Sequence, residues 1–379
     1  MPDALIVCPE APYPILGGGQ LRTACLLEYL SSRYAVDVIV FREPAAPDPR
    51  ASLPANLVRS VQVVDLPYHS KSPAARALRN LRRFVQGTPP LMDRFGGFPL
   101  PIHRGYDVAV IEHFWCAPYL HALRGHAARI VLDLHNIESV LLERSAAAQG
   151  SFGRTLLRRF AGASRRSEAK LLPRFDTLLV TSEDDRRTIG AGVVWPNTIP
   201  YVPQPQAQKR DHIVFSGNMA YHPNIDAARH FASATWPRIR ETNPSVKWRV
   251  AGRNPEALRL PPEDRVEITG ALTDPIAEIA TARAAVVPLL SGSGTRFKII
   301  EAWAAGTPVI STTIGAEGLG ATPGDHLLIA DTPADFAAAV TAVLNDEALA
   351  DRLATAGRQH YEANFTWPIA WKMLEEVGL

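Results

Sequence analysis

The sequence holds few cysteines and no long run of hydrophobic residues. Its three cysteines, Cys8, Cys25 and Cys116, are odd in number and lack the spacing of a metal site, so they predict packing residues in a reduced, cytoplasmic protein. The longest apolar runs, such as ALIVC and AAVVPLL, fall well short of the roughly 20 residues that a membrane-spanning helix needs. The start MPDALIV has no basic region before its apolar run, which argues against a signal peptide.

Several chemical signatures are also missing. The chain has no HExxH motif, no Asp-x-Asp in a strand context and no cluster among its 11 histidines, so we expect neither a metal nor another cofactor. A net charge of +2 without an aromatic-rich basic platform disfavours nucleic acid as a partner.

What is present is enough material for two domains. A chain of 379 residues, 46% of them hydrophobic, is too long for one ordinary core. The small net charge hides an asymmetry, because residues 1–196 carry 24 Lys and Arg against 18 Asp and Glu, whereas the remainder carries 16 against 20. A basic first half could face an anionic membrane or an acidic acceptor, or it could simply be solvated.

Short β-branched runs alternate with amphipathic stretches along both halves. Continuous apolar strands of this kind are typical of parallel sheets covered by helices on both faces. The Pro- and Gln-rich stretch NTIPYVPQPQAQKRD interrupts the pattern, which predicts a linker. We therefore expect two doubly wound α/β domains, at residues 1–197 and 211–363, joined by residues 198–210, with a terminal helix at 364–379 that could return to the first domain.

Residues 291–312 read SGSGTRFKIIEAWAAGTPVIST and follow an apolar strand. Small residues there would let backbone amides approach an anion, and the start of the next helix favours phosphate. Arg296 and Lys298 would add cationic donors, and Glu301 could accept hydroxyl groups of a ribose or a sugar. A glycine-rich turn before an ordinary amphipathic helix would give the same letters, so the stretch alone leaves both interpretations open.

The longer stretch SGTRFKIIEAWAAGTPVISTTIGAEGL closely resembles the donor-site signature of glycosyltransferase family 4. Further pieces match in the family's order: GGGQLR, LHNIES, PNTI, VFSGNMAYHPNIDA and WRVAGRNP. The resemblance covers nearly the whole chain and is closer to the polysaccharide and glycolipid branch than to glycogen or sucrose synthases. It implies a retaining enzyme of GT-B architecture, with two Rossmann-like domains, an interdomain cleft, the acceptor on the first domain and a nucleotide sugar on the second.

The resemblance also implies roles for residues of the second half. Arg296 and Lys298 would stabilise the leaving diphosphate in place of a metal. Ser293 stands where many relatives carry a Glu, and SGNMAYHP stands where many carry Arg and Lys, so the donor contacts are expected to differ here. The implied donor-binding residues are Gly217, Asn218, Arg253, Gly270, Leu272, Ser293, Gly294, Thr295 and Glu301.

In the first half, three adjacent glycines precede a helix that is expected to begin near Gln20. They do not form a dinucleotide GxGxxG motif, and they could either line the cleft or merely permit tight packing. His135 follows an apolar strand and, by resemblance, would contact the donor sugar or position the acceptor, while Glu138 could cap the next helix. The remaining residues expected on the acceptor side are Gly17, Gly18, Gly19, Arg22, Glu112, His113 and Asn136.

Two other functions remain open from the sequence. A nucleotide-sugar 2-epimerase shares this fold but would need acid and base groups in the cleft, and Ser293 removes one carboxylate. A non-catalytic nucleotide-sugar binding protein is the other alternative, against which His135 and the basic pair argue.

Segments 71–104 and 151–174 are basic and interleaved with Leu and Phe, and the second has seven basic residues and one acidic residue. Such segments could lie on an anionic bilayer, which would suit a lipid-linked or membrane-proximal acceptor, a glycan or a natural product being the other acceptors considered. They could equally be ordinary helices with Arg facing water. The protein is thus expected in the cytoplasm, with peripheral contact at the inner membrane face if the first interpretation holds.

Overall fold

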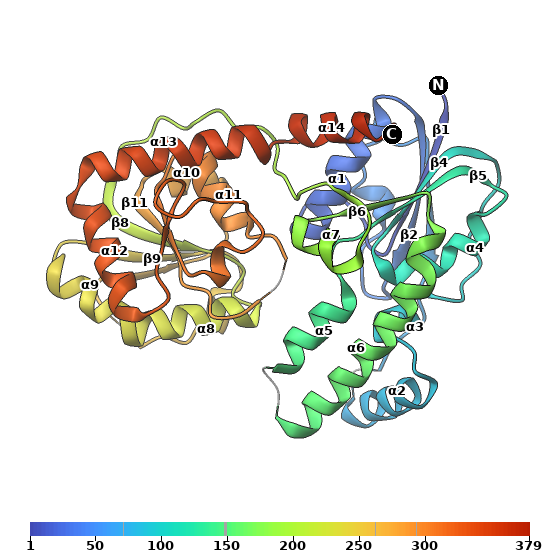
Figure 1. The fold of residues 1–379 in the computed structure, drawn as a ribbon, viewed down its shortest axis with the longest axis horizontal. Helices are drawn as coiled ribbons and strands as arrows, with labels where there is room; N and C mark the ends of the chain where they lie inside the picture. The colour runs from blue at the N-terminus through green and yellow to red at the C-terminus, as the bar shows by residue number, and fades with distance from the viewer. Residues whose placement is uncertain (71, 148–149, 262, 293) are drawn as a thin grey trace. The chain divides into compact units, whose positions relative to one another are not determined.

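The computed structural model describes residues 1–70, 72–147, 150–261, 263–292 and 294–379, and the chain divides into two compact units (Figure 1). Unit 1 comprises Met1–Asn197 and Trp371–Leu379, and unit 2 comprises Thr198–Ala370.

Unit 1 is built on a seven-stranded parallel sheet in the order β3-β2-β1-β4-β5-β6-β7. Its central strands are mostly apolar and mostly buried, as expected for a sheet that is covered on both faces. The strands are β1 (Asp3–Cys8), β2 (Ala35–Arg42), β3 (Ser60–Asp65), β4 (Tyr106–Glu112), β5 (Ala127–Asp133), β6 (Thr177–Val180) and β7 (Val193–Val194).

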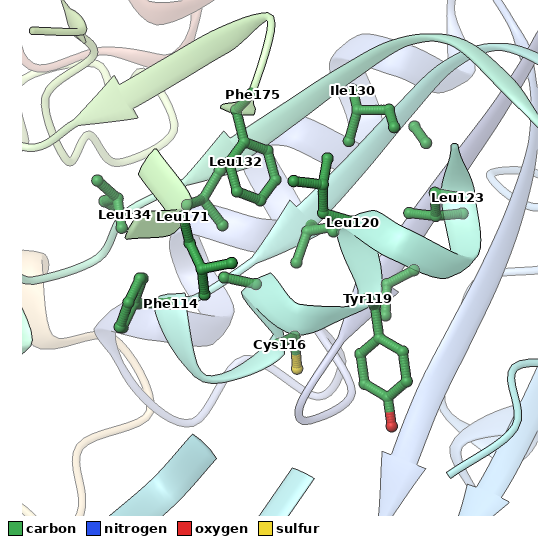
Figure 2. Packing of buried hydrophobic residues seen from close by; sticks show 14 of the residues in the cluster. Phe114, Cys116, Tyr119, Leu120, Leu123, Ile130, Leu132, Leu134, Leu171 and Phe175 are labelled. Atoms are coloured by element: carbon green, nitrogen blue, oxygen red, sulfur yellow. The ribbon is translucent and has the colours of Figure 1, made fainter. Parts of the chain in front are cut away.

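The helices of unit 1 connect these parallel strands and cover the sheet. A core of aromatic and aliphatic side chains fills the layer against one face, and Figure 2 shows Phe114, Tyr119, Leu132 and Phe175 within it. The helices are α1 (Gly18–Ser31), α2 (Pro73–Gln86), α3 (Pro90–Phe95), α4 (Leu120–Leu123), α5 (Glu138–Ala147), α6 (Ser151–Leu171) and α7 (Glu183–Ile189).

Unit 2 repeats the same winding with a six-stranded parallel sheet, in the order β10-β9-β8-β11-β12-β13. Its strands are β8 (Arg210–Ser216), β9 (Lys247–Ala251), β10 (Val266–Thr269), β11 (Ala282–Val287), β12 (Val309–Ser311) and β13 (Leu328–Ile329). Its helices are α8 (His222–His230), α9 (Trp236–Thr242), α10 (Pro275–Ala280), α11 (Phe297–Ala304), α12 (Pro333–Asn345) and α13 (Glu347–Asn364).

Every apolar run that predicted a strand forms one, so the doubly wound α/β fold expected from the sequence is confirmed. One detail differs near residue 296. Helix α11 begins at Phe297, so Arg296 is its N-cap and lies outside the helix that was expected to carry it. Gly306 follows the helix with a φ of 66°, which only glycine adopts readily, and this explains why the helix ends there.

The last helix, α14 (Trp367–Glu376), spans the division between the units. Trp371 donates its indole N–H to the Cys25 carbonyl at 3.1 Å, and Arg129 donates to the carbonyls of Val377 and Gly378. The end of the chain is therefore part of unit 1. No helix within the described ranges has both the length and the hydrophobicity needed to cross a bilayer.

Candidate active site

Each sheet has one point where the strand order reverses, and ligands of open α/β sheets bind beyond the carboxyl ends of the strands at that point. In unit 1 the reversal lies between β1 and β4, and in unit 2 it lies between β8 and β11. The residues predicted from the sequence gather at these two places.

In unit 1, two carboxylates end neighbouring strands. Glu112 ends β4 and pairs in register with Asp133, which ends β5. His135 follows β5 and places its Nε2 2.6 Å from Glu112 Oε2 and 3.4 Å from Asp133 Oδ2. All three side chains are buried. The sheet register places the two carboxylates side by side, and the imidazole of His135 lies next to both.

Arg22 of α1 neutralises one of these carboxylates. Its Nη2 and Nε lie 2.5 and 2.7 Å from Asp133 oxygens, while Nη1 donates to the Trp195 carbonyl and to Asn197 Oδ1. The guanidinium also lies over the Trp195 ring at 4.2 Å. These contacts make Arg22 a buried link between α1, β5 and the segment that follows β7; its role on the acceptor side remains a prediction.

Burial and charge shift the titration of this cluster in different directions. Burial alone would lower the pKa of His135, but its hydrogen bonds to Asp133 and Glu112 outweigh that effect and raise the pKa to about 9. Burial raises the pKa of Glu112, and the negative charge of Asp133 raises it further. Burial also acts to raise the pKa of Asp133, but the charge of Arg22 outweighs this effect and the pKa is lowered. The favoured state is a protonated His135 beside an ionised Asp133.

His113 lies directly against this imidazole. Its ring centroid is 3.6 Å from that of His135 and 4.3 Å from that of Trp115. Burial, helped by the charge of His135, holds the pKa of His113 well below its usual value, so it is the neutral member of the pair. The backbone of His113 has a φ of 63°, a strained value for a residue that is not glycine, and such strain concentrates at functional sites.

Gly19 leaves space beside the two histidines. A Cβ at Gly19 would lie 3.4 Å from Glu10 Oε1, 3.5 Å from His135 Nδ1 and 3.7 Å from His113 Nε2. Three ionisable groups therefore converge on the position that a side chain at residue 19 would occupy. Gly17 and Gly18 lie at the start of α1, and Asn136 is half-buried beside His135.

The same cluster offers ligand atoms of the kinds that metals use. Within the described ranges, Glu112, Asp133 and His135 form a group whose ligand atoms lie within 4.8 Å of one another. However, Arg22 already donates to both Asp133 oxygens, and a guanidinium in that position repels a divalent cation. The donor set fits a hydrogen-bonded ion cluster better than a metal site.

In unit 2, Lys298 is the centre of the candidate site. Its Nζ donates to Asn224 Oδ1 at 2.6 Å and lies 4.7 Å from the Phe215 ring centroid. A Cβ at Gly217, directly after β8, would lie 3.2 Å from that Nζ, so glycine leaves the ammonium accessible from the strand end. Burial lowers the pKa of Lys298 to about 7, although the charge of Glu301 acts in the opposite direction.

Glu301 follows Lys298 by almost one turn of α11, and burial raises its pKa to about 7. Arg296 is 4% exposed and its Nη2 donates to the carbonyls of Gly292 and Ile314, both at 3.1 Å. Arg296 therefore ties together the two loops that follow β11 and β12. Lys298 is the more direct candidate for a contact with an anion.

The other predicted donor residues surround the same strand ends. A Cβ at Gly252, after β9, would lie only 1.8 Å from the Gly217 carbonyl oxygen, and the Gly252 N–H donates to the Gly270 carbonyl. Asn218 accepts a hydrogen bond from Asn254 at 2.7 Å. The ends of β8, β9 and β10 are thus packed backbone to backbone. Of the remaining residues, Arg253 and Gly294 are exposed, Leu272 and Thr295 are half-buried, and Ser293 lies outside the described residues.

Two family models match this chain in succession. Residues 17–205 match the glycosyl transferase 4-like domain, and residues 210–346 match the glycosyl transferases of group 1. Together the matches span most of the sequence and follow the division into two units. The chain belongs to the group 1, family 4-like glycosyltransferases. This assignment makes it a glycosyltransferase and confirms the resemblance that its motifs indicated.

Relatives of this glycosyltransferase include an uncharacterised 44.6 kDa protein in the cps region of Klebsiella pneumoniae. The two are 23% identical over 353 residues, and the alignment covers 89% of each chain. Glycogen synthase of Mycobacterium tuberculosis is 31% identical over 169 residues, which are 41% of this chain and 39% of that protein.

Solved structures show the same GT-B fold. Sucrose-phosphate synthase of Thermosynechococcus elongatus has a TM-score of 0.65 at 19% identity, covering 99% of this chain and 98% of that one. HepE of Anabaena, in complex with UDP and glucose, has a TM-score of 0.63 at 15% identity, covering 100% and 99%.

Some residues of the candidate site are not predicted from the sequence. Asp133 precedes His135 by two positions and falls within a predicted strand, although a charged residue at the end of an apolar run is a usable signal. Glu10, two residues after β1, and Asn224, in α8, have no local pattern that marks them. They join the site only because the sheet order brings separate strand ends together.

Proposed function

We propose that this glycosyltransferase moves a sugar from a nucleotide-sugar donor to an acceptor hydroxyl with retention of configuration and without a metal. The observation that carries the proposal is Lys298. A half-buried ammonium that donates to a neutral amide, beside a glycine at a strand end of the switch point, suits an anionic diphosphate. The structure of HepE in complex with UDP and glucose supports a donor of this class.

In the proposed reaction the bond between the anomeric carbon and the diphosphate oxygen breaks as the acceptor oxygen bonds to that carbon from the same face. The hydroxyl proton passes to the departing phosphate, so no protein nucleophile is needed. Lys298 stabilises the charge that develops on the leaving group, and Arg296 holds the loops whose amides face it. Glu301 would accept the ribose hydroxyls.

The unit 1 cluster would serve the sugar and the acceptor. A protonated His135 can donate from the nitrogen that faces Gly19, while its other nitrogen is held by Glu112. The imidazolium would thereby orient a sugar or acceptor hydroxyl without itself removing a proton. Its carboxylate partners keep the ring fixed, which is the preorganisation that catalysis requires.

For the acceptor we propose a glycan or a glycolipid of polysaccharide synthesis, with a natural product as the alternative. The cps-region relative supports the first. We also propose a cytoplasmic location with peripheral membrane contact, which the arginine-rich helices α2 and α6 support.

A panel of nucleotide sugars tests the proposal. Each donor is incubated with the protein, released nucleoside diphosphate is measured, and thermal stabilisation is recorded in parallel. We expect one donor to stabilise the protein and to be turned over equally well with EDTA. Dependence on added Mg²⁺ or Mn²⁺ would contradict the metal-independent mechanism.

The same panel separates the alternatives. An epimerised donor in the absence of acceptor would identify a nucleotide-sugar 2-epimerase, and tight binding without turnover on any acceptor would identify a binding protein. Retention is tested by the anomeric configuration of the product.

A further inference from the structure

None of the residues of helix α2 is buried. Leu78 and Val85 on its apolar side are 69% and 74% exposed. The helix also carries Arg76, Arg79, Arg82 and Arg83, of which Arg83 is paired with Asp93, and it has no acidic residue. A basic helix with a sharply divided apolar side and low overall hydrophobicity is typical of helices that lie in a membrane interface.

A cavity of about 500 Å³ lies between α2 and α6, which neighbour each other in Figure 1. Its apolar wall is formed by Ala77, Leu81 and Phe84 of α2 and by Leu156 of α6. Its volume is in the range of pockets that enclose small-molecule ligands. Arg76 lines the cavity, and the Arg159 guanidinium lies 5.2 Å above the Phe84 ring, so cations border an otherwise apolar space.

We propose that α2 docks on an anionic bilayer and that the α2–α6 cavity takes one hydrocarbon chain of an anionic lipid. The arginines would contact the headgroup phosphates, and the exposed Leu78 and Val85 would enter the acyl boundary. A second copy of this chain is a poor occupant, because it would bring Arg76, Arg79 and Arg82 of α2 against their own counterparts. The inference deepens the acceptor side of the proposed function, and lipid binding can be measured without any sugar transfer.

The first test uses soluble probes on the full chain. Dodecyl phosphate, kept below micelle formation, is titrated by calorimetry against dodecyl maltoside and inorganic phosphate. We expect dodecyl phosphate to bind at least tenfold more tightly than either. Decyl phosphate, which is shorter by two methylenes, should bind about 15-fold more weakly, because each buried methylene contributes about a fourfold change in affinity. Equal binding of the neutral dodecyl maltoside would overturn the anionic assignment.

Variants locate the site. Ala77→Trp fills the cavity and should weaken dodecyl phosphate at least tenfold, whereas Ala74→Trp, on the same helix but outside the cavity wall, should bind as the wild type does. Arg76→Gln should weaken binding, and Arg187→Gln in α7, where the side chain is 70% exposed, is the matched charge control. Thermal denaturation checks that each variant folds. Unchanged binding by a folded Ala77→Trp variant would overturn the cavity assignment.

The second test is co-sedimentation with vesicles. We expect binding to phosphatidylglycerol vesicles at low salt, little binding to phosphatidylcholine vesicles, and loss of binding as salt screens the charge. Leu78→Ser with Val85→Ser should reduce sedimentation. A protein that binds dodecyl phosphate but no vesicle would overturn membrane docking. A dimer that light scattering detects for the wild type, and that the Leu78→Ser, Val85→Ser variant does not form, would also overturn it. Release of nucleoside diphosphate in the donor panel is a separate readout, so either proposal can fail alone.

Discussion

Arg22 and Asp133 are 111 positions apart in the sequence and form a fully buried ion pair, with Nη2 2.5 Å from Oδ1. Removing one partner of such a pair leaves an uncompensated charge, which typically costs about 3–5 kcal/mol. We expect Arg22→Met to lower the free energy of unfolding by that order in urea denaturation. The double variant Arg22→Met, Asp133→Asn should lose less than the sum of the single losses. Exposed ion pairs such as Arg187–Asp184 typically contribute about 1 kcal/mol or less to stability. A loss of unfolding free energy below that value in Arg22→Met would contradict the importance of the buried pair.

The stability of unit 1 should depend on pH through His135. Its pKa in the folded protein is about 9, above the usual value of 6.5, because Asp133 and Glu112 outweigh burial. The protonated ring therefore stabilises the fold fully below pH 6.5, and this contribution is lost as the pH rises through 9. We expect the difference in unfolding free energy between wild type and His135→Gln to shrink by up to about 3 kcal/mol between pH 6 and 10. If the unfolding free energies of the two proteins changed in parallel with pH, the cluster would not hold a protonated His135.

Lys298→Ala and Arg296→Ala should both reduce turnover about 100-fold or more, the order seen when a group that stabilises developing charge is removed. Their effects on stability should differ. Arg296 donates to the carbonyls of Gly292 and Ile314, so its loss should also lower the melting temperature, whereas Lys298→Ala removes a buried charge and should leave it unchanged or higher. Initial rates and thermal denaturation measure the two effects. Wild-type rates in a folded Lys298→Ala variant would exclude Lys298 from the donor site.

Nucleoside diphosphate binding should take up a proton at pH 8. Lys298 has a pKa of about 7, so it is mostly neutral at that pH in the free protein, and a bound diphosphate favours its charged form. Calorimetry of UDP binding in two buffers of different ionisation enthalpy measures the uptake, which should be up to about one proton and should vanish in Lys298→Met. Uptake that persists in this variant would assign the proton to another group.

Two glycines should respond differently to the same substitution. Gly252→Ala would place a Cβ 1.8 Å from the Gly217 carbonyl oxygen at a φ of 144°, so we expect severe destabilisation or failure to fold. At Gly19 the nearest atom would be 3.4 Å away, an ordinary contact, so Gly19→Ala should fold normally and lose activity only if a ligand uses that space. Thermal denaturation and turnover of the two variants test this contrast.

The sequence predicted the two sheets well because an apolar parallel strand has a strong local signature. It also predicted residues directly after strands, such as His135 and Gly217, because both sheets place those positions at one edge. It did not predict that Arg22 would turn inward to Asp133, since the pairing depends on the packing of α1 against β5. For the same reason Asn224 was missed, because only the tertiary position of α8 brings its amide to Lys298.

The return of Trp371–Leu379 to unit 1 means that unit 2 is, in connectivity, an insertion within unit 1. During synthesis on the ribosome, residues 198–370 are complete before unit 1 has received its last segment, and that segment supplies the partners of Cys25, Tyr29 and Arg129. Unit 2 can therefore finish folding first, although it is encoded later. A truncated chain that ended at Ala370 would keep all of unit 2, yet it would lose stability in unit 1, which begins at Met1.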